Sequence, residues 1–132
     1  MIWGRESVYC LDTSFLIDLL RGLPACIKKY KDIEPNALFT TSISVFEIMK
    51  SKKLTGLEVE QINKLILRLK LLEFGLKDAE EAALIYRKLS LEGKMVNELD
   101  LFIGATAKNN GLTIVTADKG FSRIEGLRVE FY

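Results

Sequence analysis

Four acidic side chains stand at or soon after the ends of apolar segments in this chain of 132 residues. Asp12 directly follows the apolar run SVYCL, and Asp118 closes the run LTIVTAD. Glu47 and Asp100 each lie in the first turns of an expected helix. If the four carboxylates meet in one concavity, they repel one another unless some bind protons or a cation lies between them. Such a site suits Mg²⁺ or Mn²⁺, which can activate water for phosphodiester cleavage.

The chain contains no histidine. This excludes a histidine general acid or base, a Ser-His-Asp or Cys-His arrangement and a histidine-ligated zinc site. Any catalysis therefore depends on carboxylates, lysines, hydroxyls, thiols or bound cofactors.

The segments that position these acids alternate between strand and helix patterns. Strands are expected at residues 7–11, 37–43, 71–76, 112–118 and 127–132. Helices are expected from Thr13, at 25–32, over 44–53, along 62–69, from a cap at Asp78 to a C-cap at Gly93, and over 98–111. Several strands are continuous apolar runs, which is typical of a parallel sheet covered on both faces. We therefore expect an α/β three-layer sandwich forming one domain over residues 1–132.

Ligands of open parallel sheets collect outside the carboxyl ends of the strands. If the first, second and fourth strands lie side by side, Asp12, Glu47 and Asp118 share one rim. Asp100 can then join them from the N-terminus of its helix.

Two of these acids have local structural alternatives at helix starts. Asp12 can cap the helix that begins near Thr13. Ser44 and Glu47 match the capping box S-x-x-E, so the alternative for Glu47 is a purely structural role at the start of its own helix.

The other two acids have alternatives of the same kind. Asp100 lies three residues after Asn97, a spacing that is typical of a capped helix start. Asp118 can be a turn residue in ADKG, with Lys119 and Gly120 completing the turn.

The sequence around the four acids resembles the PIN-domain family, and most closely the toxin ribonucleases of VapBC-type toxin–antitoxin pairs. The likeness covers nearly the whole chain. It is carried, in the family's order, by LDTSFLIDLLRG, TTSISVFEI, AALIYRKLSLEGKMVNELDLFIGATA and LTIVTADKGFSRIEGLRV.

This resemblance implies a five-stranded parallel sheet with helices on both faces and an Mg²⁺- or Mn²⁺-dependent endoribonuclease acting on RNA. In-line attack of water would leave a 5′ phosphate. The resemblance also implies a homodimer and an antitoxin whose C-terminal segment blocks the groove. The implied catalytic and metal-binding residues are Asp12, Glu47, Asp100 and Asp118, with Thr13, Ser14 and Thr116 as hydrogen-bonding supports.

The chain departs from the family pattern at three places. About ten residues, including the exposed-looking WGRE, precede the first strand. Lys119 follows Asp118 and the next acid is Glu125, which puts a second metal site in question. Glu98 is either a substitute ligand or a solvated acid favoured by the helix dipole.

Lysines near the expected site are candidates for binding RNA phosphates. Lys94 and Lys119 flank the site, whereas Lys50, Lys52 and Lys53 follow the helix of Glu47. The alternative for the last three is a solvated helix end, where lysines suit the dipole.

An apolar stripe marks the helix expected along residues 62–69. Ile62, Leu65, Ile66 and Leu69 share one face, which predicts core packing. Additional apolar residues, Leu67, Leu71 and Leu72, allow a surface for a second copy or an antitoxin helix as well.

Other functions fit the sequence less well. A haloacid-dehalogenase-like phosphatase needs a second aspartate where Ser14 stands, and a response regulator needs one where Leu76 and Lys77 stand. A catalytically inactive PIN-like binding or assembly module is the remaining alternative.

Composition indicates a soluble globular protein, and with so small a net charge, binding to a polyanion needs a local basic patch or metal ions. The chain is 48% hydrophobic and 28% charged, with a net charge of +1. No apolar run approaches the length that spans a bilayer, and no signal peptide is visible. The two cysteines, Cys10 and Cys26, form no disulfide framework, so we expect a cytoplasmic protein.

Overall fold

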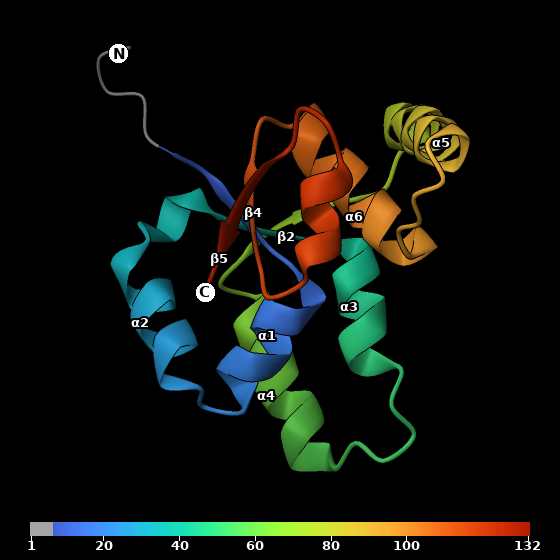
Figure 1. The fold of residues 1–132 in the computed structure, drawn as a ribbon. Helices are drawn as coiled ribbons and strands as arrows, with labels where there is room; N and C mark the ends of the chain where they lie inside the picture. Colours follow the sequence, from blue (N-terminus) through green and yellow to red (C-terminus); the bar gives the residue numbers. More distant parts are fainter. Residues whose placement is uncertain (1–6) are drawn as a thin grey trace.

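The structure is a computed structural model that describes residues 7–132, so the WGRE segment lies outside the described residues. Its parallel strands form one sheet in the order β3-β2-β1-β4-β5 (Figure 1). The strands are β1 (Tyr9–Leu11), β2 (Leu38–Thr41), β3 (Lys70–Leu72), β4 (Thr113–Thr116) and β5 (Arg128–Phe131). β1 pairs with both β2 and β4, which confirms the predicted neighbours of the first strand.

Helices cover both faces of the sheet, which confirms the three-layer α/β sandwich. Ile114 and Val115 are adjacent in β4 and fully buried on opposite faces. Val115 packs with α1, α2 and α4, and Ile114 packs with α5 and α6 (Figure 1). The helices are α1 (Thr13–Leu20), α2 (Pro24–Asp32), α3 (Ser42–Met49), α4 (Gly56–Ile66), α5 (Leu76–Leu91) and α6 (Glu98–Asn109), with 3-10 helices η1 (Pro35–Ala37) and η2 (Lys119–Arg123).

The third strand is shorter than the sequence predicts. It ends at Leu72 rather than at residue 76, because Phe74 leaves the sheet and packs against Phe102 of α6. The two ring centroids are 4.7 Å apart. This contact ties the edge of the sheet to the α5–α6 layer.

The start of α5 also differs from the expectation. The helix begins at Leu76 with Gly75 as its N-cap, so the predicted cap at Asp78 is wrong. Asp78 is the third helical residue and accepts a 2.9 Å hydrogen bond from the Gly75 N–H. At the other end, the C-cap is Glu92, one residue before the predicted Gly93, and Gly93 follows it with φ +70°.

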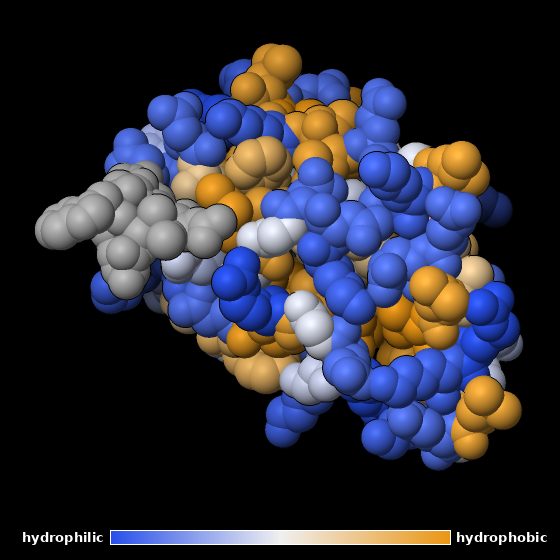
Figure 2. All heavy atoms as spheres, turned by 90° about the horizontal axis from the view of Figure 1, so that it is seen from above, coloured by the Kyte–Doolittle hydropathy of each residue, from blue (hydrophilic) through white to orange (hydrophobic). Residues whose placement is uncertain are grey.

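The apolar stripe of α4 packs into the core, as predicted. Ile62 and Leu65 are buried and Ile66 is half-buried, and Leu69, also buried, lies just beyond the end of the helix at Ile66. Leu67 and Leu71 are 86% and 46% exposed. Seen from above, hydrophilic side chains predominate on the surface and hydrophobic ones form separate patches (Figure 2). In residues 7–132, no helix is both long and apolar enough to cross a membrane.

Candidate active site

Asp12 lies between β1 and α1 and is 3% exposed. Its Oδ1 accepts a 2.9 Å hydrogen bond from the Phe15 N–H, so Asp12 does cap α1. The same carboxylate also accepts hydrogen bonds from Ser14 Oγ (2.7 Å) and Thr116 Oγ1. Capping therefore uses only part of this carboxylate, and its other contacts point to the end of β4.

Ser14 and Thr116 connect Asp12 to the loop that carries Asp118. The Asp118 N–H donates to Thr116 Oγ1 at 2.9 Å, and the Ala117 N–H donates to Ser14 Oγ at 3.2 Å. Asp12 and Asp118 thus follow the neighbouring strands β1 and β4, and the hydroxyl groups of Ser14 and Thr116 connect the Asp12 carboxylate to the backbone next to Asp118.

Glu47 reaches the same rim from α3. The Thr13 hydroxyl donates a 2.6 Å hydrogen bond to Glu47 Oε1, which joins α1 to α3. The proposed capping box is wrong, because the N-cap of α3 is Thr41, whose side chain accepts from the Ser44 N–H. Ser44 is the third helical residue, so Glu47 has no role at the cap.

Asp100 and Asp118 approach each other from α6 and the end of β4. Burial raises the pKa of Asp100 to about 7, and a hydrogen bond with Asp118 adds to this rise. The negative charges of Asp118, Glu47 and Asp12 raise the pKa further. The charges of the other three acids therefore all reach Asp100.

Burial and charge also act on Asp12. Burial raises the pKa of Asp12, its hydrogen bonds from Thr116, Phe15 and Ser14 lower it, and the charge of Asp118 raises it. The net direction is upward, so ionising this carboxylate costs more free energy than it would in water.

The donor set fits a hard divalent cation. The oxygens available to such an ion belong to carboxylates and hydroxyls, and a cation would relieve the repulsion that, after burial, raises the pKa of Asp100. Within residues 7–132, no three acidic or cysteine side chains already surround a position for a metal ion.

A family model described as the PIN domain matches residues 9–127. The chain belongs to the PIN-domain family. Two curated relatives are similar over 126 residues, which is 92% of this chain and 96% of each relative. They are the ribonuclease VapC2 of Haemophilus influenzae, 28% identical, and the tRNA(fMet)-specific endonuclease VapC of Shigella flexneri, 24% identical.

The PIN domain also resembles solved structures over nearly its full length. One is the DNA-bound VapBC of Salmonella typhimurium, with a TM-score of 0.86 and 25% identity. The match covers 96% of this chain and 98% of that one. The five-stranded α/β architecture is therefore that of VapBC structures.

Glu98 does not join the four carboxylates of this PIN domain. It is exposed in the first turn of α6 and lines a groove between α5 and α6 with Phe74, Tyr86 and Phe102. This position favours the helix-dipole explanation over a substitute ligand.

Asn97 and Asp118 also form local caps. The Asn97 side chain caps α6 by accepting a 2.9 Å hydrogen bond from the Leu99 N–H. Asp100 takes no part in this cap. Asp118 accepts a 2.8 Å hydrogen bond from the Gly120 N–H and its carbonyl accepts one from the Phe121 N–H, so the predicted turn through Lys119 and Gly120 is present and opens η2. The cap uses Oδ1 of Asp118.

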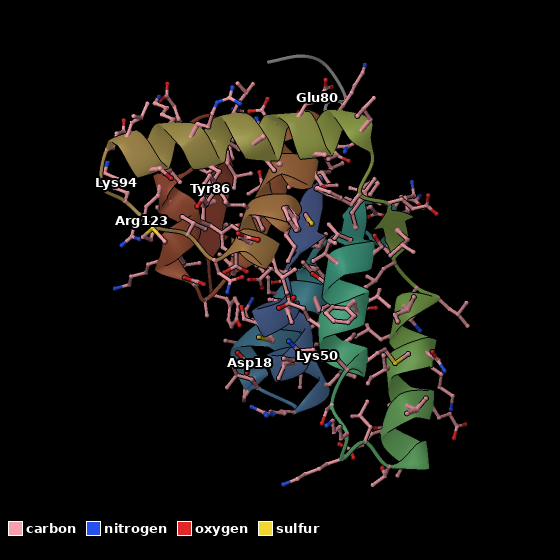
Figure 3. The ribbon with its side chains drawn as sticks, turned by 90° about the vertical axis from the view of Figure 1, so that its right-hand side faces the viewer. Asp18, Lys50, Glu80, Tyr86, Lys94 and Arg123 are labelled. Atoms are coloured by element: carbon pink, nitrogen blue, oxygen red, sulfur yellow. The ribbon has the colours of Figure 1, made fainter. Side chains whose placement is uncertain are left out.

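The candidate RNA-binding lysines fall into separate groups. Lys119 is exposed beside Asp118, at the rim of the site. Lys94 lies 3.7 Å from Glu92 and lines a cavity with Arg123, and Figure 3 shows Lys94 and Arg123 near the end of α5. Lys50 is at the end of α3 with its ammonium over the Phe46 ring (Figure 3). Lys52 and Lys53 are exposed in the following loop.

Two polar residues near the site, Asp18 and Tyr132, have no counterpart in the sequence prediction, and Tyr132 donates a 2.7 Å hydrogen bond to Asp18. Buried Ser44 is predicted from the sequence only as part of a helix cap, and its Oγ lies 3.1 Å from the Thr13 hydroxyl oxygen. The spacing of Ser14 and Asp18, four residues apart on one helix, is a signal for their shared face. The sequence carries no local signal for Tyr132.

Proposed function

We propose that this PIN domain is a divalent-metal-dependent endoribonuclease and the toxin of a toxin–antitoxin pair. The observation that carries the proposal is the placement of Asp12 and Asp118 at the carboxyl ends of the paired strands β1 and β4, with Asp100 of α6 close enough to feel the charges of Asp118, Glu47 and Asp12. Its curated relatives are named as ribonucleases, and a solved neighbour is a VapBC complex.

Asp12, Asp100 and Asp118 would hold Mg²⁺ or Mn²⁺, and Glu47 would hold a water molecule or a second cation. A bound divalent ion supplies the acidity that makes water nucleophilic near neutral pH and the positive charge that binds a phosphate. Since each ligand is a carboxylate, the site needs no histidine.

The chain's own residues orient this site. Thr13 fixes Glu47 through their 2.6 Å hydrogen bond, while Ser14 and Thr116 fix the two oxygens of Asp12. Lys119 is the lysine best placed for an RNA phosphate, with Lys94, Lys50, Lys52 and Lys53 as more distant candidates. Attack by water rather than by the ribose 2′ hydroxyl leaves a 5′ phosphate.

Cleavage of an RNA panel with and without Mn²⁺ tests this function. We expect Mn²⁺-dependent cuts with 5′-phosphate ends, and none with the Asp118→Asn variant as a control. Cleavage that persists in excess chelator, or 2′,3′-cyclic phosphate ends, would contradict the mechanism. Absence of both Mn²⁺ binding and cleavage would favour the inactive binding module.

A groove beside the acids is the place where we propose that an antitoxin segment binds. Its volume is about 270 Å³, its apolar wall comes from α1, α3 and α4, and Glu47 lies on its lining. A peptide in this groove would therefore end beside the carboxylates. The groove is lined by Ile17, Leu20, Arg21, Glu47, Ile48, Ser51, Leu54, Glu58, Gln61 and Ile62.

We further propose a homodimer and a cytoplasmic location. Exposed Leu67 and Leu71 support a second interaction surface, which light scattering of the purified protein would test. Cys10 and Cys26 are both buried and free, as expected of a protein from a reducing compartment.

A further inference from the structure

A cavity of about 560 Å³ lies along α5, and its other walls come from the last turn of α6, from η2 and from the loop after η2. Figure 3 shows Lys94 and Arg123 near the C-terminal end of α5. The lining carries more cationic than acidic side chains, and the cationic ones are Lys88, Lys94, Lys108 and Arg123. The cavity therefore suits an anion better than a cation.

Glutamates offset the lysine charges in this cavity to different degrees. Two lysines form ion pairs with acids of the same lining, and these pairs are Lys88–Glu125 and Lys108–Glu81. The third pair is loose, because 3.7 Å separate Lys94 Nζ from Glu92 Oε1 and both side chains are exposed. An exposed pair at that distance contributes little free energy, so Lys94 is free to face another anion.

Arg123 is the cation of this lining whose charge no acid offsets. Within residues 7–132 it forms no ion pair, and its Nη1 donates a hydrogen bond to the Met95 carbonyl. A guanidinium is always charged and carries five N–H donors in a rigid plane. The bond to Met95 uses one donor and orients the group, which leaves the others for a ligand. Such a planar fork matches the oxygens of a phosphate.

The 3-10 helix η2 connects the cavity to the four carboxylates. Its N-cap is Asp118 and its last residue is Arg123. A 3-10 helix rises about 2.0 Å per residue, so these two residues lie about 10 Å apart along the axis. Lys119 and Ser122 are three residues apart and share one side of η2, and Ser122 lines the cavity. Donor groups thus lead from the acids to Arg123.

The opposite wall of the cavity leads to the same acids. Lys94 and Met95 belong to the loop between α5 and α6, and Asp100 lies in the first turn of α6. The hydrogen bond from Arg123 to Met95 therefore joins the segment that follows Asp118 to the segment that precedes Asp100. The cavity is bounded by both acid-bearing segments.

Cleavage at four carboxylates requires an anionic strand to approach an anionic site. The net charge of +1 gives little general attraction for a polyanion. Binding free energy must therefore come from cationic side chains that lie near the acids without being offset by them. Arg123 meets both conditions.

We propose that Arg123, assisted by Lys94, binds a backbone phosphate of the RNA a short distance along the strand from the bond that is cut. A phosphate contact positions the strand and reads no base, so this site holds RNA of any sequence. This inference rests on the proposed function, because it takes RNA as the substrate and adds a binding site outside the four carboxylates.

Fluorescence anisotropy of a labelled single-stranded oligouridine in chelator tests the site. Chelator prevents metal-dependent cutting, and a uniform strand is an adequate probe because the contact is to the backbone. We expect Arg123→Gln to weaken binding about tenfold at low salt and to reduce the slope of log affinity against log salt by about 0.7, the value for one phosphate contact on a single strand.

Arg128 supplies a matched control. It is also an exposed arginine, and its Nη2 donates a 2.8 Å hydrogen bond to a backbone carbonyl, that of Gly111. It is the first residue of β5, so it lies at the end of the parallel sheet opposite to Asp12 and Asp118. Arg128→Gln makes the same change in net charge and should leave both the affinity and the salt slope at their wild-type values.

Two further variants separate phosphate binding from folding. Lys94→Gln alters an exposed, loosely paired side chain, and it should weaken RNA binding in the same direction as Arg123→Gln but by less. Arg123→Lys keeps the charge and loses the fork, so the salt slope should persist while affinity falls. Melting temperatures show whether each variant is folded, and Lys94→Gln decides the outcome if Arg123→Gln is not.

Equal affinity in wild type and Arg123→Gln, or an equal loss in Arg128→Gln, would overturn the inference. Steady-state cleavage in Mn²⁺ separates this from failure of the proposed function, because Arg123→Gln should raise KM and leave kcat unchanged. A wild-type protein that cuts RNA, with an unchanged KM in Arg123→Gln, would rule out the phosphate site alone. A wild-type protein that neither binds nor cuts RNA would overturn the proposed function and the phosphate site together.

Discussion

The Thr13 hydroxyl donates a 2.6 Å hydrogen bond to Glu47 Oε1, and this bond joins two helices that follow neighbouring strands. Thr13 opens α1 directly after Asp12, whereas Glu47 lies in the second turn of α3. The bond therefore fixes the distance between an acid on one helix and an acid at the start of the other.

Replacing Thr13 with valine tests the importance of this bond. Thr13→Val keeps the side-chain shape but removes the donor, so Glu47 is free to rotate. We expect RNA cleavage to fall about tenfold, the effect of losing one hydrogen bond to a charged group. The measurement is the initial cleavage rate at saturating Mn²⁺. A Thr13→Ser variant, which keeps the donor, should retain most of the rate, and an equal loss in both would count against this role.

Thermal stability distinguishes the role of Thr41, the N-cap of α3, from the role of Glu47, the catalytic candidate on the same helix. Thr41→Val removes the hydroxyl that accepts from the Ser44 N–H, so we expect unfolding to become easier by about 1 kcal/mol. Glu47→Ala should change the melting temperature of the metal-free protein less, because the loss of the Thr13 hydrogen bond is offset by removal of a repelling charge. Calorimetric melting of both variants checks this, and a loss in Glu47→Ala as large as in Thr41→Val would contradict it.

Asp12→Asn tests whether Asp12 binds a metal ion in addition to capping α1. Asparagine also caps helices, so the Phe15 N–H retains an acceptor and the fold should survive. We expect Mn²⁺ binding and cleavage to be lost, because the charge is gone. Circular dichroism and a binding titration measure the two properties. An unfolded variant with intact specific activity would show that capping is the main role of Asp12.

The raised pKa of Asp100 predicts how pH changes stability. Without metal, the folded protein binds this proton up to about pH 7, while the unfolded chain releases it near the ordinary value of 3.8. Between these values the folded state binds more protons, so the free energy of unfolding falls as pH rises. Asp12 contributes in the same direction, because its pKa is also raised.

Melting curves in chelator across this pH range check the sign. The wild-type melting temperature should decrease with increasing pH more steeply than that of Asp100→Asn, and saturating Mn²⁺ should reduce the difference. Equal slopes for the two proteins in chelator would show that Asp100 carries no such proton.

Much of the fold was predictable because the local patterns agree with one another. Central strands such as β1 and β4 are apolar on both faces, which indicates a covered parallel sheet. Asp12 and Asp118 lie at the ends of these strands, so sheet pairing alone brings them to the same rim.

Other features could not be predicted, because they depend on competition between neighbouring cap residues or on contacts between residues distant in the sequence. The hydroxyl-rich run from Thr40 to Ser44 offers several candidate caps, and packing selects Thr41 over Ser44. The contact between Asp18 and Tyr132 joins residues 114 positions apart, and no periodic pattern predicts it. The early end of β3 likewise depends on Phe74 finding Phe102 in the folded protein.

The most direct measurement of the central claim is an anomalous difference map from a crystal of this protein soaked in Mn²⁺. The account predicts a peak between the carboxylates of Asp12, Asp100 and Asp118, with Glu47 facing it. The map of the Asp118→Asn variant should lose or weaken that peak. A fully soaked wild-type crystal without density among these carboxylates, or with Mn²⁺ bound elsewhere, would contradict the account.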